Sequence, residues 1–445
     1  MTDPADLGVC EAAALLARGE LSSRDLTEAC LARIGARDGT HSHDGDPGSI
    51  NAWVRVYPED ALAAADVADE RLAGGGAPAL CGVPVGLKDL YAVAGKPLTA
   101  SSRVLDEAPS RDCDAWARLR AEGMVLLGHL HTHEFAAGGT TDQVGNPWAL
   151  DRSPGGSSGG SAAALAARMT PAATGTDTAG SLRIPSAYCG TSAIKPTRGL
   201  VPLRGIVPLG PTLDHAGPMA RSVPDCEPLL AAMAGVRPPA ERRTLRRIAV
   251  SPRLPLVELD ADVADGFDAA CVLLHAEPVP PPEVELDLGT ALLDVVCAEM
   301  LAYHRRFDDR RADYRPSIRG FLEYGERRAL TAEEYVAIQG RRAEVTAIWV
   351  DWLEEHRVDA LVEPTVPIVA RRRGDGYDEA FTDFAEISLT HYWDWTGFPV
   401  VALPSGVGAR SGLPVGVSLI GPPESDWDLL AAGASLQAEL GTVAP

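Results

Sequence analysis

The chain has 445 residues, 46% of them hydrophobic, and its 62 acidic residues against 40 lysines and arginines give a formal net charge of −22. A chain of this length and composition can bury a large core. The acidic excess repels phosphate backbones and anionic lipid surfaces, so we expect neither nucleic acid nor a membrane among its partners. The N-terminal stretch lacks the basic start and apolar core of a signal peptide, and no run of about 18 uncharged apolar residues occurs, so a cytoplasmic protein is predicted.

Helical and strand patterns alternate over the first half of the chain. Two amphipathic helices are expected within residues 10–35, and a third helix over 59–76. Short apolar strands follow within 81–95 and 123–135, and the alternation continues to about residue 220. The pattern predicts an α/β fold, in which a central sheet is covered by helices on both faces.

The second half begins with a mainly helical region over 258–356, in which Trp349 and Trp352 share one helix face. Strands return after residue 358, and a last helix is expected over 425–440. Because no internal repeat and no long linker interrupts the chain, we treat residues 1–445 as a single domain.

A stretch rich in serine and glycine, SPGGSSGGSAAALAAR, occupies residues 153–168. A flexible tether would continue into polar sequence, whereas this stretch runs directly into a good helix former, with Ser161 as the expected N-cap. The stretch lacks the GK[ST] ending of a Walker loop and the GxGxxG pattern of a dinucleotide loop. It therefore predicts a helix N-terminus with available N–H groups that serves neither of these phosphate-binding purposes.

A second turn of small residues, ATGTDTAGS, ends at Ser181. Gly180 lets the backbone bend sharply before this serine and can leave successive N–H groups pointing in one direction, as in an oxyanion hole beside a nucleophile. Turns of this composition also begin ordinary helices, so the turn alone leaves both interpretations open.

Lys88 lies in an otherwise apolar strand, VPVGLKDL. A lysine buried there would lose proton affinity and could act as a base near pH 7. The alternative is a lysine that extends to the surface and pairs with Asp89.

Lys88, the serine-glycine stretch and the segment GTDTAGSLRIPSAYCGTSAIKPTRGLVP closely resemble, in this order, the amidase signature family of serine hydrolases. Ser157 follows Lys88 by 69 residues and Ser181 follows Ser157 by 24, which fits the layout of that family. The resemblance covers most of the chain and implies the amidase signature fold, with a central mixed sheet, a signature core at about 80–225 and a variable substrate-pocket region at about 300–395.

The resemblance also implies the catalytic roles. Ser181 would be the nucleophile, and Ser157 would correspond to the family's serine with a cis peptide bond, which bridges between Ser181 and the base Lys88. No metal or organic cofactor is implied. Backbone N–H groups would hold the oxyanion in the transition state, namely those of Thr178, Ala179, Gly180 and Ser181.

Several residues near the implied cleft are candidates for substrate binding. His133, Gly138 and Gly156 lie in or beside the family motifs, where many relatives have Lys and Asn in place of His129 and His131. Alternate histidines followed by Glu134 could form a metal site, but the family needs no metal and no other ligand cluster is evident, so we predict none.

An aromatic cluster, HYWDWTGFP, lies near the C-terminus. Trp393 and Trp395 flank Asp394, where relatives commonly have Asn. The two indoles could line a pocket for an aromatic or apolar acyl or amine group, and the alternative is that both belong to the core.

The leading functional hypothesis is a cofactor-free hydrolase that cleaves the C–N bond of a small-molecule amide, with carbamates (urethanes) and aryl esters open to the same chemistry. The alternative is the glutamine-hydrolysing component of a tRNA-dependent amidotransferase. Those proteins typically carry Gln where this chain has Ile184, and MDEF where it has THEF, which favours a free-standing enzyme. An idle scaffold is disfavoured because all three catalytic residues are present, and homodimers are common among soluble enzymes.

Overall fold

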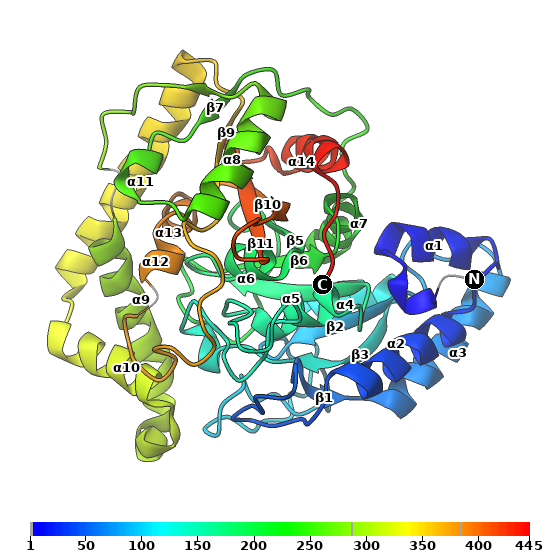
Figure 1. Cartoon of the computed structure of the whole chain (residues 1–445). Helices are drawn as coiled ribbons and strands as arrows, with labels where there is room; N and C mark the ends of the chain where they lie inside the picture. Colours follow the sequence, from blue (N-terminus) through cyan, green and yellow to red (C-terminus); the bar gives the residue numbers. More distant parts are fainter. Residues whose placement is uncertain (1–2, 286–287, 383) are drawn as a thin grey trace.

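The computed structural model describes residues 3–285, 288–382 and 384–445. Within these residues, eleven strands form one sheet in the order β1-β3-β2-β4-β6-β5-β10-β11-β9-β7-β8 (Figure 1). The strands are β1 (Trp53–Val56), β2 (Pro84–Lys88), β3 (Val125–Leu130), β4 (Ala172–Asp177), β5 (Ser192–Lys195), β6 (His215–Ala220), β7 (Ile248–Val250), β8 (Glu277–Pro278), β9 (Ala360–Pro364), β10 (Val400–Val407) and β11 (Pro414–Ile420).

The sheet is mixed, as the family resemblance implies. β2 runs parallel to β3 and β4, and β7 runs parallel to β8 and β9. The remaining neighbours are antiparallel. Because β2 and β4 are adjacent and parallel, the residues that follow their carboxyl ends come out at the same edge of the sheet.

Helices make up most of the rest of the described chain. The α-helices are α1 (Val9–Ala17), α2 (Ser23–Arg37), α3 (Pro58–Ala73), α4 (Asp114–Ala121), α5 (Gly159–Ala166), α6 (Arg183–Cys189), α7 (Val223–Ala234), α8 (Ala261–Leu274), α9 (Gly289–His304), α10 (Pro316–Arg328), α11 (Ala332–Glu355), α12 (Phe384–Ile387), α13 (His391–Thr396) and α14 (Asp426–Leu440). The short 3-10 helices are η1 (Pro4–Asp6), η2 (Glu134–Ala136), η3 (Leu254–Leu256) and η4 (Arg305–Asp313). No helix in the described ranges is both long enough and apolar enough to cross a membrane.

The helices flank the sheet in groups. α5 and α6 pack against each other and against the central strands, whereas α7 and α14 pack together on β5, β6 and β10. α9, α10, α11 and α13 form a further group beside the sheet, at the left of Figure 1. The predicted α/β architecture is therefore confirmed.

The predicted elements match the structure closely, with one correction in the serine-glycine stretch. Helix α5 begins at Gly159 and not after Ser161, which lies inside its first turn. The hydroxyl of Ser161 donates a hydrogen bond to the carbonyl of Thr174 (2.8 Å), so it ties α5 to β4 and does not cap the helix.

Candidate active site

Lys88 is the last residue of β2, and its side chain is completely buried. Its ammonium group donates to three hydroxyl oxygens at 2.8 Å each, Oγ of Ser157, Oγ of Ser158 and Oγ1 of Thr176. Hydroxyl groups provide no countercharge, so the cost of desolvating the ammonium is largely uncompensated. Burial accordingly lowers the pKa of Lys88 to about 7, although the nearby carboxylates of Asp177 and Asp214 oppose this shift.

Ser157 follows the cis peptide bond between Gly156 and Ser157, as the resemblance implies. Its carbonyl accepts hydrogen bonds from the N–H of His133 and from the hydroxyl of Thr141, both at 3.0 Å. A Cβ atom at Gly156 would lie 2.3 Å from the carbonyl oxygen of Thr140, so only glycine fits there. The serine-glycine stretch is thus tightly packed against its surroundings.

The turn that presents Ser181 joins β4 to α6. Asp177, the last residue of β4, accepts hydrogen bonds from the N–H groups of Gly180 (2.5 Å) and Leu182 (3.1 Å). The same carboxylate forms an ion pair with Arg183 (2.8 Å), and both side chains are at most 1% exposed. One buried carboxylate therefore fixes the conformation of the whole turn.

The bond to Asp177 corrects the predicted oxyanion hole. The N–H of Gly180 is already used, so it cannot serve an oxyanion in this conformation. No acceptor lies within hydrogen-bonding range of the N–H of Ala179 or Ser181 among the residues that the structure describes. The side chain of Thr178 donates to Asp214 (2.6 Å), which anchors the start of the turn.

Replacing Asp177 with alanine is expected to destabilise the protein by about 3–5 kcal/mol, because Arg183 would lose a buried countercharge. Urea unfolding followed by circular dichroism measures this loss. The control is Asp66→Ala, which removes a partner of Arg24 from an ion pair whose side chains are 45% and 53% exposed. Exposed pairs contribute little, so equal destabilisation by the two variants would contradict the structural role of Asp177.

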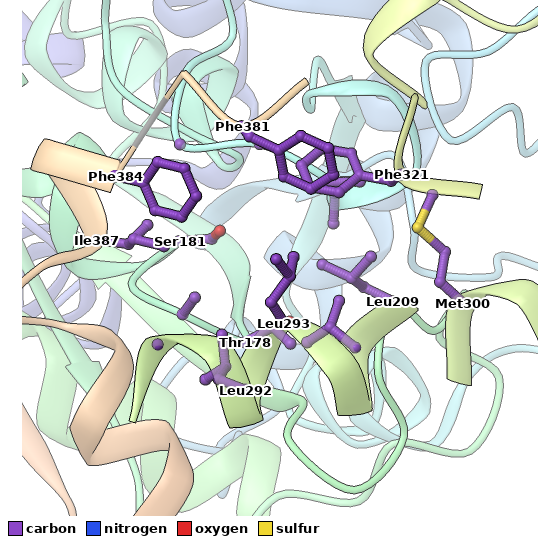
Figure 2. A pocket seen from close by; sticks show the side chains of 17 residues that line it. Thr178, Ser181, Leu209, Leu292, Leu293, Met300, Phe321, Phe381, Phe384 and Ile387 are labelled. Carbon is purple, nitrogen blue, oxygen red and sulfur yellow. The ribbon is translucent and has the colours of Figure 1, made fainter. Parts of the chain in front are cut away.

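A cavity opens above Ser181, whose side chain is directed into it in Figure 2. The floor comes from α9, with Leu292, Leu293, Val296 and Met300. The opposite side comes from Phe321 of α10 and from the segment that precedes α13. The other lining residues are Ala136, Ala137, Gly138, Gly139, Thr178, Ala179, Leu209, Gly289, Phe381, Phe384 and Ile387.

Of the predicted substrate-binding residues, Gly138 lines this cavity and His133 lies behind it. A Cβ atom at Gly138 would lie 2.4 Å from Nδ1 of His133, so the imidazole packs directly against the glycine. Nδ1 of His133 donates to the carbonyl of Thr140 (2.8 Å), and burial lowers the pKa of the imidazole to about 3, which keeps it neutral. Neither His133 nor Gly156 is part of the cavity wall, and both support the backbone beside it.

The structure does not place Trp393 and Trp395 in the cavity. Both indoles are completely buried in a hydrophobic cluster with Trp349, because helix α13 packs against α9 and α11. The core interpretation therefore fits both residues, and the pocket interpretation does not. Between them, Asp394 points to Arg183 and forms an ion pair with it.

The three histidines of the sequence motif do not converge. β3 ends at Leu130, so His131 and His133 lie beyond the strand and lose the shared face that strand geometry would give them. His129 contacts the hydroxyl of Tyr57 (2.8 Å), whereas His131 contacts that of Ser101 (3.1 Å). In the described part of the chain, no group of three or more His, Cys, Asp or Glu residues could hold a metal ion.

Sequence reasoning missed three residues that shape the site, namely Ser158, Thr176 and Asp177. Asp177 carried a usable signal, because a carboxylate at the end of a strand of small residues is as unusual as Lys88 in its apolar strand. The two hydroxyl residues carried no comparable signal, since buried serine and threonine are common beside backbone carbonyls.

Comparisons with known proteins agree with this geometry. The amidase family model matches residues 25–430. The A-type component of the glutamyl-tRNA(Gln) amidotransferase of Roseiflexus castenholzii is 35% identical, over 98% of this chain and 96% of that protein. Among solved structures, a chain described under a vestigial protein complex that reveals the origins of an s-triazine catabolic enzyme has a TM-score of 0.87 at 30% identity, covering 98% of this chain and 99% of its own. A 6-aminohexanoate cyclic dimer hydrolase has a TM-score of 0.86 at 26% identity, covering 99% and 98%.

Proposed function

Because the chain belongs to the amidase family and is a hydrolase of carbon–nitrogen bonds, we propose that it hydrolyses small-molecule amides through an acyl-enzyme on Ser181. Lys88 is the base in this proposal, and Ser157 relays the proton. The observation that carries the proposal is the hydrogen bond of 2.8 Å from the buried Lys88 ammonium to the hydroxyl of Ser157, within one site with the cavity-lining Ser181.

The reaction begins with neutral Lys88, which accepts a proton from Ser157 while Ser157 accepts one from Ser181. The oxygen of Ser181 attacks the carbonyl carbon, and the N–H groups of Ala179 and Ser181, with that of Thr178, stabilise the oxyanion. The relay then returns the proton to the leaving nitrogen, and the C–N bond breaks. Water enters, gives its proton to the same relay and releases the carboxylic acid. Carbamates and aryl esters can follow the same route.

A second candidate function rests on the sequence relatives, because the Roseiflexus protein is a component of an amidotransferase. In that role the chain would hydrolyse glutamine and would act with partner proteins. Ile184 and the THEF motif differ from the residues typical of such components, and this difference supports a free-standing amidase.

The two candidates differ in what the chain can do alone. We expect the purified chain to release amine from at least one of a primary aryl amide, an anilide and an aryl carbamate, with no added protein. The Ser181→Ala variant provides the blank for each assay. Turnover of glutamine alone, or turnover that appears only with the other amidotransferase components added, would favour the second candidate and contradict our proposal.

A further inference from the structure

The cavity above Ser181 is lined almost entirely by hydrocarbon. Of its seventeen described lining residues, only Thr178 and Ser181 carry polar side chains, and both belong to the nucleophile turn. The hydroxyl of Thr178 is already bonded to Asp214. Beyond the scissile bond, the described wall therefore offers a substrate apolar contacts and no charged partner.

Aromatic rings close the side of the cavity that faces α9. The rings of Phe321 and Phe381 meet edge to face, with centroids 4.7 Å apart, and Figure 2 shows them opposite Leu292 and Leu293. Phe384, on the short helix α12, is 52% exposed at the border of the cavity. An exposed phenylalanine next to a nucleophile gains when an apolar ligand covers it.

From this lining we propose that the substrate has an uncharged, apolar acyl group that lies between α9 and the rings of Phe321 and Phe381. The inference rests on the proposed function, since it assigns the acyl group of that same reaction. Free glutamine carries an ammonium and a carboxylate close to its amide, and burying such charges without partners is costly. The cavity thus selects against glutamine and for alkyl or aryl amides.

A series of straight-chain primary amides tests the inference. Pentanamide has the carbon skeleton of glutamine without its two charges, so the pair isolates the effect of charge. We expect kcat/KM to rise about fourfold for each added methylene, so that octanamide exceeds pentanamide by about 60-fold. Glutamine should fall at least about 100-fold below pentanamide. A flat series, or glutamine as the best substrate, would overturn the inference and leave hydrolysis through Ser181 intact.

A charge placed in the wall provides the matching variant. Leu293→Asp puts a carboxylate on the cavity floor and is expected to lower kcat/KM for octanamide by at least about 50-fold and to flatten the series. The control is Val336→Asp, because Val336 is 68% exposed on α11 and does not line the cavity. If Leu293→Asp fails to fold, Phe384→Asp at the exposed border carries the same expectation. Equal octanamide kinetics in wild type and the wall variant would contradict the inference.

Binding measurements separate this inference from the proposed chemistry. Calorimetric titration of octanamide and of glutamine into the Ser181→Ala variant reports on the cavity without turnover. Binding of octanamide but not of glutamine supports the inference even if no amide is hydrolysed, and that combination would count against the proposed function alone. Binding of glutamine in preference to octanamide would overturn the inference.

Discussion

Replacing Ser181 with alanine is expected to lower kcat for every amide substrate by a factor on the order of 10⁴ to 10⁶, because no other group can form the acyl-enzyme. Ser181 is 7% exposed and is the serine that lines the cavity, whereas Ser157 and Ser158 are fully buried against Lys88. Steady-state amine release, measured beside thermal unfolding, separates loss of chemistry from loss of fold.

Ser186→Ala is the matched control for this experiment. Ser186 is a buried serine on α6, five residues beyond Ser181, and its hydroxyl has no hydrogen-bond partner among the described residues. Removing that hydroxyl should leave kcat within a few-fold of wild type. If Ser181→Ala retained activity within tenfold of wild type, the nucleophile would have to be another residue.

Replacing Lys88 with methionine is expected to lower kcat/KM by at least about 10³-fold, because the relay through Ser157 would lose its proton acceptor. Methionine keeps an unbranched apolar stem, so it suits the buried position of Lys88. The control is Lys195→Met. Lys195 is also fully buried with a pKa lowered to about 7, but its ammonium group donates to the carbonyl of Pro196. Equal losses in the two variants would contradict a specific role for Lys88.

The pH dependence of the wild-type enzyme reports on the same residue. Burial lowers the pKa of Lys88 to about 7, and only the neutral amine can accept a proton. We therefore expect kcat/KM to rise as the pH passes through about 7 from below and then to level off. A rate that fell over this interval, or that stayed constant from pH 5 to 9, would show that Lys88 does not act as the base.

The sequence predicted the parts of the site that depend on local chemistry. A lysine in an apolar strand and a glycine before a serine are unusual enough to be noticed, and Lys88 and Ser181 do come together at one edge of the sheet. The cis bond at Ser157 came from the family resemblance, and the structure contains it. The catalytic roles of these residues and the single-domain organisation stay predictions.

Tertiary packing decided the remaining assignments. Helical periodicity says that Leu292 and Leu293 lie on α9, but not that α9 forms the floor of a cavity, because that depends on where α10 and the segment before α13 pack. The same limit explains the error at Trp393 and Trp395, whose large apolar side chains suit a pocket and a core equally well. Gly180 looked like an oxyanion donor until its bond to Asp177 was visible.

The central claim, an acyl group carried by Ser181, is tested most directly by intact-protein mass spectrometry. The enzyme is mixed with an aryl carbamate or aryl ester that deacylates slowly, quenched in acid, weighed and digested. Our account predicts a mass increase equal to the acyl group, located on the peptide that contains Ser181 and absent from the Ser181→Ala variant. An acyl group on the peptide that contains Ser157, or labelling that persists in Ser181→Ala, would contradict it.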